Sequence, residues 1–173
     1  MSNTITVIII NYNSKFLLEK CLVHILQQSL SSIRILVFDN GSTDGSADRV
    51  KYLSGVTVKF LDANFGFAAA NNQALLECES EFVVLLNPDA FPEPDWLKNL
   101  VSAANTYPEY TAFGSRQLNA VTPEILDGTG NVYHISGKAW RSGKGRSQHE
   151  ADLFAREIFL PVRLRRYIAA KHC

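Results

Sequence analysis

The sequence predicts an α/β protein built on a mostly parallel sheet flanked by helices, and three observations support this fold class. Short apolar runs rich in β-branched residues recur along the chain, amphipathic helical patterns separate them, and the connections are short. Runs that are apolar at every position are typical of strands buried on both faces. A regular alternation of strand and helix indicates a parallel sheet with right-handed crossovers.

The strands are expected where the apolar runs occur. In chain order they cover residues 6–10, 34–38, 56–61, 81–86 and, more weakly, 110–114. Helical patterns fill the intervals, over residues 18–26, 47–53, 67–79 and 94–104. Ser14 is a candidate N-cap for the first helix, and Pro94 is suited to open the last.

The chain is long enough for one domain with a real core. We expect residues 4–116 to form the α/β core, residues 117–149 a glycine-rich loop region, and residues 150–173 an atypical tail of mixed helical character. Residues 127–145 contain five glycines, which predicts a long loop with a hairpin. We therefore expect the functional residues to lie in the α/β core.

Composition and charge exclude some classes of protein. Lys+Arg and Asp+Glu both number 17, and this balance argues against a general nucleic-acid binder. Residues 5–10 are too short an apolar run for a signal peptide or a membrane span. Cys21 and Cys78 fall in helical patterns and are expected to be buried free thiols, which fits a reducing, cytoplasmic compartment.

Polar residues follow each of the first four expected strands. They are Asn11-Tyr12-Asn13, Asp39-Asn40-Gly41-Ser42, Asp62 with Asn64-Phe65-Gly66, and Asn87-Pro88-Asp89. Ligands of open parallel sheets bind outside the carboxyl ends of the strands, so these clusters predict one binding edge. Asn, Asp, Gly and Ser are also ordinary turn formers, so each cluster taken alone is open to a purely structural interpretation.

Two carboxylates stand out in these clusters. Asp39 directly follows a buried strand, where it can accept hydrogen bonds from a base N–H or a ribose hydroxyl. Asp89 can hold Mg²⁺ or Mn²⁺ against a diphosphate, although the alternative is an acid at the third position of a proline turn. Asn64-Phe65-Gly66 precedes a helix whose first N–H groups favour an anion, and it is not a GxGxxG motif.

The ordered set of motifs resembles family-two glycosyltransferases of the GT-A fold, within them the bacterial rhamnosyltransferase-like group. The matching stretches, spread over residues 4–159, are VIIINYN (7–13), DNGSTD (39–44), NFGFAAANN (64–72), LLNPDA (85–90) with Pro92, Pro94, Trp96 and Leu97, DGTG (127–130) and YHISG (133–137). The resemblance is specific because of the order of the set, since each motif alone is weak.

The resemblance implies roles for these residues. Those expected to contact a nucleotide sugar are Asn11, Tyr12, Asn13, Asp39, Asn40, Ser42, Asn64, Gly66, Asn71 and Asn87. Asp39 would bind the base, while Asn64, Gly66 and Asn71 would face the ribose and diphosphate. Asn87-Pro88-Asp89 stands where the family has a DxD motif, so Asp89 alone would be the carboxylate ligand of the metal.

The resemblance also implies an activity. The chain would be an inverting, metal-dependent glycosyltransferase using a dTDP- or UDP-linked sugar, acting on a glycan or lipid-linked acceptor, cytoplasmic or peripheral at the inner face of the membrane. Two alternatives remain open: a fragment that binds nucleotide sugar without turnover, and another α/β nucleotide-binding transferase. The last would need a glycine-rich loop after the first strand, which residues 11–15 lack.

The C-terminal part departs from the family pattern. The family places its catalytic base in a later Glu-Asp motif, and no such acid pair follows residue 152, so the catalytic residue is unknown and the sheet is expected to be incomplete. An incomplete sheet would expose an edge and favour a homodimer. Residues 159–173 can be read in a shifted frame as SPCAAAALYRRKAL, and the hypothesis of a frameshift is tested by the gene sequence.

Overall fold

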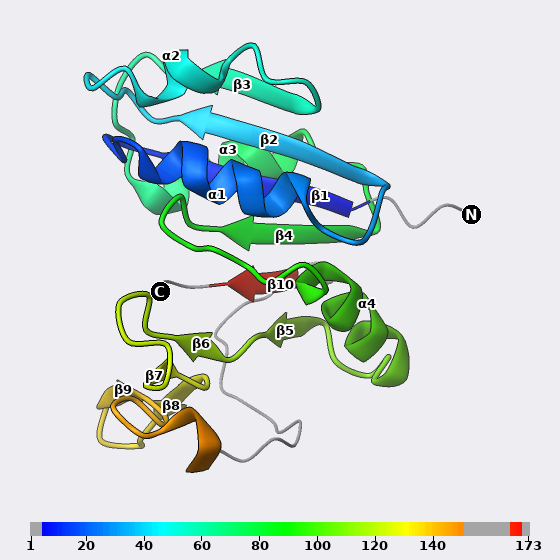
Figure 1. Ribbon diagram of the computed structural model, residues 1–173, viewed down its shortest axis with the longest axis vertical. Helices are drawn as coiled ribbons and strands as arrows, with labels where there is room; N and C mark the ends of the chain where they lie inside the picture. The colour runs from blue at the N-terminus through cyan, green and yellow to red at the C-terminus, as the bar shows by residue number, and fades with distance from the viewer. Residues whose placement is uncertain (1–4, 151–166, 171–173) are drawn as a thin grey trace.

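The computed structural model describes residues 5–150 and 167–170. Its helices and strands, shown in Figure 1, are β1 (Ile5–Asn11), α1 (Leu17–Leu26), β2 (Ile33–Asp39), α2 (Ser46–Val50), β3 (Val56–Phe60), α3 (Phe67–Leu76), β4 (Phe82–Leu86), α4 (Trp96–Thr106), β5 (Ala112–Gly114), β6 (Gln117–Leu118), β7 (Leu126–Gly128), β8 (Asn131–Tyr133), β9 (Ala139–Arg141), the 3₁₀ turn η1 (Gln148–Glu150) and β10 (Tyr167–Ala170).

One sheet of six parallel strands, in the order β3-β2-β1-β4-β10-β5, organises the molecule. The predicted mostly parallel sheet is therefore confirmed. Two small antiparallel pairs, β6–β7 and β8–β9, follow β5 and lie beyond it in Figure 1. The second pair is the hairpin that the glycine-rich region predicts.

Both faces of the sheet are covered, which explains why its central strands are mostly apolar along their length. Ile5, Val7 and Ile9 of β1 pack with α1 and α4 on one face. Ile8 and Ile10 pack with α3 on the other. Every residue of β1 is buried, because alternate side chains of a strand point to opposite faces.

The start of the first helix differs from the prediction. Ser14 does not cap α1: the N-cap position is Phe16, and no side chain caps it. The Ser14 hydroxyl instead donates to the side-chain oxygen of Asn11. The Ser14 hydroxyl is engaged at the end of β1, so the N-cap assignment is wrong, whereas the start of the helix at Leu17 agrees with the predicted pattern.

Two further elements end or form differently from the prediction. Helix α3 ends at Leu76 rather than near residue 79, so Cys78 lies beyond it and is half-buried, not buried as expected. Residues 167–170 form strand β10 between β4 and β5 rather than a helical segment. A short apolar run fits either structure, and pairing with neighbouring strands decides between them. Residues 151–166 and 171–173 of the atypical tail lie outside the described residues.

Across residues 5–150 and 167–170, every helix is too short or too polar to span a bilayer.

Candidate functional site

The end of β1 is tied to the end of β2 by one buried amide. Asn11 lies opposite Asp39 in the parallel register, and its side chain is fully buried. Its Nδ2 atom donates to Asp39 Oδ1 at 2.6 Å, to Ser46 Oγ at 2.8 Å and to Ser42 Oγ at 3.1 Å. A buried polar side chain is tolerated because its hydrogen bonds are made within the protein, so Asn11 fixes the geometry of this edge.

Asp39 is buried and is held by the turn that follows it. Besides Asn11, it accepts the backbone N–H of Ser42 through Oδ2 at 3.0 Å, and its carbonyl accepts the N–H of Leu61 at 2.8 Å. Only 3% of the residue is exposed. The structural interpretation of this acid is therefore correct, and a ligand would use the lone pairs that its carboxylate keeps.

The ends of β2 and β3 meet through two asparagines. Asn40 Nδ2 donates to Asn64 Oδ1 at 2.9 Å, and Asn40 Oδ1 accepts the N–H of Phe65 at 3.0 Å. Gly41, with φ +75°, lies so close to the chain before Asn64 that a Cβ atom would stand 2.8 Å from the carbonyl carbon of Ala63. A glycine at this position is what lets the two loops touch.

The start of α3 presents its backbone at this edge. Gly66 has φ +83° and ψ 159°, a conformation that only glycine adopts readily, and its N–H donates to Asn64 Oδ1 at 2.9 Å. Phe65 and Phe67 on either side of it are 50% and 55% exposed. Asn71, one turn into the helix, is buried and donates to the carbonyl of Phe67 at 2.8 Å, so its amide is engaged within α3.

Tyr12 and Asn13 extend beyond β1. The Tyr12 side chain is 49% exposed at the edge of the network. Asn13 adopts a left-handed conformation, accepts the N–H of Thr43 at 2.8 Å and donates its own N–H to Ser42 Oγ at 3.0 Å. The loops after β1 and β2 are therefore bound to each other along their length.

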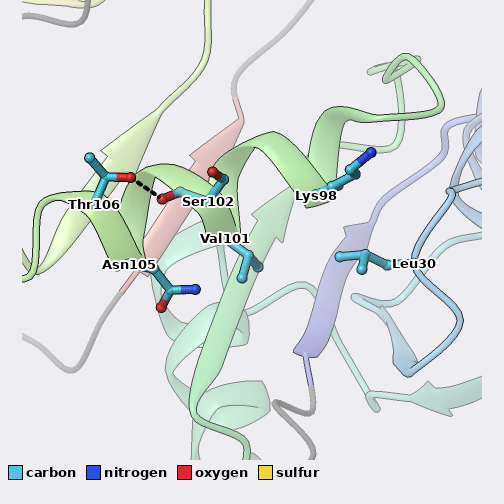
Figure 2. A pocket seen from close by; sticks show the side chains of 6 residues that line it. All are labelled: Leu30, Lys98, Val101, Ser102, Asn105 and Thr106. Carbon is cyan, nitrogen blue, oxygen red and sulfur yellow. Dashed lines mark hydrogen bonds between the residues drawn. The ribbon is translucent and has the colours of Figure 1, made fainter.

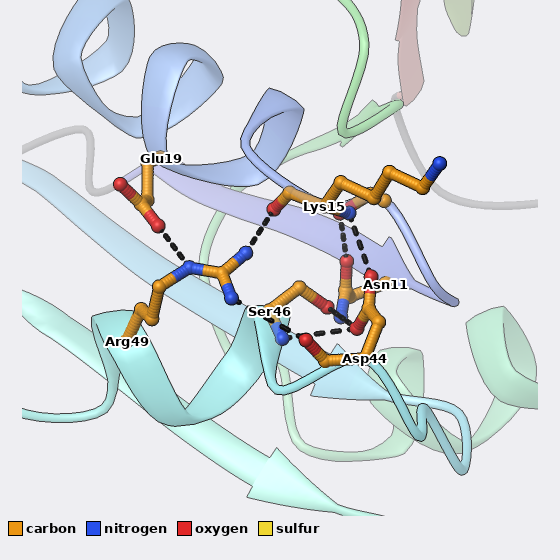
Figure 3. Close-up of polar contacts among 7 residues, drawn as sticks. Asn11, Lys15, Glu19, Asp44, Ser46 and Arg49 are labelled. Carbon is orange, nitrogen blue, oxygen red and sulfur yellow. Dashed lines mark hydrogen bonds and ion pairs between the residues drawn. The ribbon is translucent and has the colours of Figure 1, made fainter.

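Lys15 is held in an unusual conformation by the loop after β2, as Figure 3 shows. Its φ of 54° is uncommon for a residue with a side chain. Its N–H donates to Asp44 Oδ2 at 2.7 Å, and its carbonyl accepts from Arg49 Nη2 at 2.6 Å. Arg49 also forms an ion pair with Glu19. These contacts fix the path of the chain between β1 and α1.

Asp44 is the acid in this set of contacts around Lys15, which we call the Lys15 clamp and which also includes Arg49 and Glu19. It also accepts the N–H of Ser46 at 2.9 Å and its hydroxyl at 2.6 Å. Burial acts to raise the pKa of Asp44, but the hydrogen bonds from Ser46 and Lys15 and the charge of Arg49 hold that pKa below its usual range. Sequence reasoning assigned no role to Asp44, Lys15 or Arg49; the acid two residues before Ser46 was the one available signal, because Asp and Ser favour such local bonds.

The fourth cluster follows β4, beside β1. Leu86 pairs with Ile9, so Asn87 and Asp89 reach the same edge as Asn11. The N–H of Ala90 donates to the carbonyl of Asn87 at 3.1 Å, which makes Asp89 the third residue of a proline turn. Asn87 is buried and Asp89 half-buried. The turn interpretation is correct, and it leaves a carboxylate at the edge.

The donor set around Asp89 limits how a metal ion would bind. In the described part of the chain, no group of three or more His, Cys, Asp or Glu side chains is placed to hold one. A divalent cation at this edge would therefore have Asp89 as its carboxylate and would need oxygens from a phosphate and water. Mg²⁺ is commonly bound in this way, by few carboxylates and substrate phosphates.

A hollow of about 390 Å³ lies elsewhere, along α4. Figure 2 shows its lining, which comes from Leu30 and from Lys98, Val101, Ser102, Asn105 and Thr106 of α4. Leu30 precedes β2, so this hollow opens toward the amino ends of the strands. None of the sequence-predicted site residues contributes to it.

A parallel sheet with polar residues gathered at its carboxyl edge is the arrangement of α/β nucleotide-binding proteins. The chain belongs to glycosyl transferase family 2, whose profile matches residues 6–147. It is 31% identical over 118 residues to glycosyltransferase GlyA of Streptococcus pneumoniae, which covers 66% of this chain. It is 26% identical over 145 residues to the N-acetylglucosaminyl-diphospho-decaprenol L-rhamnosyltransferase of Mycobacterium tuberculosis, which covers 77% of this chain.

Solved structures confirm the GT-A fold. The crystal structure of Staphylococcus aureus TarS 1–349 in complex with UDP-GlcNAc superposes with a TM-score of 0.60 and 21% identity, over 68% of this chain and 35% of that one. The mannosyltransferase PcManGT of Pyrobaculum calidifontis, in complex with GDP-Man and Mn²⁺, has a TM-score of 0.58 and 29% identity, over 66% of this chain and 35% of that one.

The matched regions are a minor part of these relatives. The chain spans 17% of the pneumococcal protein and 45% of the mycobacterial one. The match therefore concerns the fold and the family of this segment.

Proposed function

We propose that the chain binds the donor of a glycosyltransferase that moves a sugar from a nucleotide diphosphate to an acceptor hydroxyl, in the synthesis of a bacterial polysaccharide or lipid-linked glycan. The observation that carries this proposal is the hydrogen-bonded network joining the ends of β1, β2 and β3 around Asn11, Asp39, Asn40 and Asn64. Its place at the carboxyl edge of the sheet, in a chain of this family, supports it.

Within this site, different residues would contact different parts of the nucleotide-sugar donor. Asp39 would accept from the base or ribose, with Tyr12 beside it and Asn13, Asn40 and Ser42 holding the loops in place. Asn64 and Gly66 would bring the first N–H groups of α3 to the diphosphate, where helix N-termini favour negative charge. Asn71 would face the ligand only after its amide leaves the carbonyl of Phe67.

We include Mg²⁺ or Mn²⁺ in the proposal, with Asp89 as its carboxylate and Asn87 nearby. The bound ion would neutralise the negative charge that develops on the departing diphosphate. The Mn²⁺ in the mannosyltransferase complex supports this assignment. Asp89 could coordinate the ion from the turn that it occupies, because this turn lies at the carboxyl edge of the sheet.

The reaction would invert the anomeric carbon. The acceptor oxygen forms a bond to the anomeric carbon while the bond between that carbon and the diphosphate oxygen breaks. The proton of the acceptor hydroxyl passes to a carboxylate base. We assign that base to none of the described residues. The name of the mycobacterial relative favours a lipid-linked acceptor. We add a dTDP- or UDP-linked donor and a peripheral position at the inner face of the membrane to the proposal. A homodimer, which light scattering would detect, completes the proposal.

Calorimetric titration with UDP, dTDP and GDP, with and without Mn²⁺, tests the donor site. We expect one nucleotide to bind in an Mn²⁺-dependent way, and Asp89→Asn to weaken it by about tenfold or more, as expected for the loss of a charged ligand worth ~1.4 kcal/mol or more. Asp95→Asn is the matched control, because Asp95 is an exposed acid just before α4 and lies outside the four polar clusters. Absence of binding by all three nucleotides would overturn the proposal, and equal binding without metal would remove the role of Asp89.

A further inference from the structure

The β8–β9 hairpin displays apolar side chains to solvent. The N–H of His134 donates to the carbonyl of Lys138 and the N–H of Gly137 to the carbonyl of His134, both at 2.8 Å, so the turn is well defined. Ile135 at its tip is 96% exposed, and Trp140 on β9 is 50% exposed. Exposing an isoleucine and a tryptophan on one small hairpin is unfavourable in water, which suggests that they are covered when the protein functions.

The same segment is basic in a chain that is neutral as a whole. Residues 131–149 contain Lys138, Arg141, Lys144 and Arg146, and they contain no Asp or Glu. Asp127 of β7 is the acid that faces them: it pairs with Arg141 and lies 4.0 Å from Lys144. Within the described residues, Lys138 and Arg146 form no ion pair. The hairpin and the residues just after it therefore carry positive charge that Asp127 neutralises only in part.

The hairpin lies on the side of the molecule that carries the candidate site. In Figure 1 strands β2 and β4 point to the left, and β8 and β9 lie at the lower left. A flat surface that touched the hairpin on this side of the molecule would face the edge where Asn11 and Asp89 are found. This placement would bring a lipid-linked acceptor toward the site, and in that respect the inference rests on the function proposed above.

We propose that the β8–β9 hairpin docks the protein on an anionic phospholipid surface, with Ile135 and Trp140 at the level of the headgroups and Lys138, Lys144 and Arg146 against the phosphates. Tryptophan is favoured at the boundary between water and lipid, and basic residues are drawn to anionic headgroups. A nucleic acid would also attract the cations and could stack a base on Trp140, but Ile135 at the tip offers it no such face. The combination of charge and apolar tip favours lipid.

Vesicle sedimentation with the full chain tests this proposal. We expect binding to vesicles of phosphatidylcholine with phosphatidylglycerol, weakened by salt, and little binding to phosphatidylcholine alone. Lys138→Gln should lower the partition coefficient by about fivefold, the effect of ~1 kcal/mol per basic residue near the surface. Trp140→Ala should lower it by a similar or larger factor, and Trp140 fluorescence should shift to the blue on binding.

Lys51 and Tyr52, beside α2, supply matched controls for the lysine and the aromatic residue of the hairpin. Tyr52 is exposed, and the charge of Lys51 is paired with Asp48. Lys51→Gln and Tyr52→Ala should leave vesicle binding unchanged. Equal losses in the two pairs of variants, no binding to anionic vesicles, or stronger binding to single-stranded nucleic acid than to vesicles would each overturn the proposal.

Nucleotide titration on the same preparations separates this inference from the donor site. Nucleotide binding without vesicle binding overturns the docking hairpin alone. Vesicle binding without nucleotide binding supports the docking hairpin and overturns the proposed donor site.

Discussion

The clamp around Lys15 leads to a prediction about how the candidate site is held together. Asp44→Asn keeps the size of the side chain but replaces one carboxylate oxygen by an amide group that cannot accept a hydrogen bond. In the wild type, Asp44 accepts a hydrogen bond from Lys15 through one carboxylate oxygen and from Ser46 through the other. The variant therefore loses one of these two sets of bonds, together with the negative charge near Arg49.

The magnitude follows from the contacts. A hydrogen bond to a charged group contributes about 1.5–3 kcal/mol, but this site is partly exposed and solvent screens it. We expect Asp44→Asn to lower the free energy of unfolding by about 1–2 kcal/mol at neutral pH. Lys15→Gly should raise it by about 0.5–1 kcal/mol, because relief of a left-handed residue, worth about 1–2 kcal/mol, exceeds the entropic cost of glycine.

Urea unfolding of the two single variants and the double variant is the assay. If Asp44 holds Lys15 in its left-handed conformation, Asp44→Asn should cost less in the Lys15→Gly background than alone, which gives a coupling that the double-mutant cycle measures. Additive effects, or an Asp44→Asn variant as stable as the wild type, would refute the reasoning.

The pKa of Asp44 gives the same interaction a pH dependence. Its pKa in the folded protein is lowered, so its contribution to stability is fully present above the ordinary aspartate value of about 3.9 and is lost as the pH falls below it. The stability difference between wild type and Asp44→Asn should therefore shrink as the pH falls from the ordinary aspartate value through the lowered pKa of the folded protein. A constant difference across this range would contradict the role of the ionised carboxylate.

Three further predictions concern stability and are measured by denaturant unfolding. Gly41→Ala should cost about 3 kcal/mol or more, because a Cβ meets backbone at 2.8 Å, whereas Gly45→Ala, with φ +71° but its nearest atom at 3.8 Å, should cost only about 1–2 kcal/mol. Asn11→Ala should cost about 2–4 kcal/mol, since it leaves buried polar neighbours unpaired. Leu22→Ala, fully buried in α1, should cost about 2–5 kcal/mol, and Val23→Ala, 51% exposed, less than about 1 kcal/mol.

Each of these comparisons has an outcome that contradicts it. Equal costs for Gly41→Ala and Gly45→Ala would mean that the loops after β2 and β3 do not touch as described. A neutral Asn11→Ala would show that the network at the end of β1 is replaced by water without loss. Similar costs at Leu22 and Val23 would contradict the assigned face of α1.

The candidate site was partly predictable because its residues follow strands directly. Asn11 and Asp39 come at the ends of apolar runs, and parallel strands align their carboxyl ends, so sequence reasoning placed them on one edge. The same reasoning did not show whether Asp39 and Asp89 bind a ligand or only form turns. The structure shows Asp89 in a proline turn and Asp39 accepting bonds from its own loop, and both are compatible with binding.

The sequence by itself determined the alternation of strand and helix, because burial on two faces demands mostly apolar residues along β1 and β2. Only the tertiary structure decided the details that depend on distant partners. The left-handed conformation of Lys15 is stabilised by Asp44 from the loop after β2 and by Arg49 of α2, and no local pattern encodes it. The strand at residues 167–170 likewise exists through its pairing with β4 and β5, since backbone hydrogen bonds between strands are supplied by neighbours in space rather than in sequence.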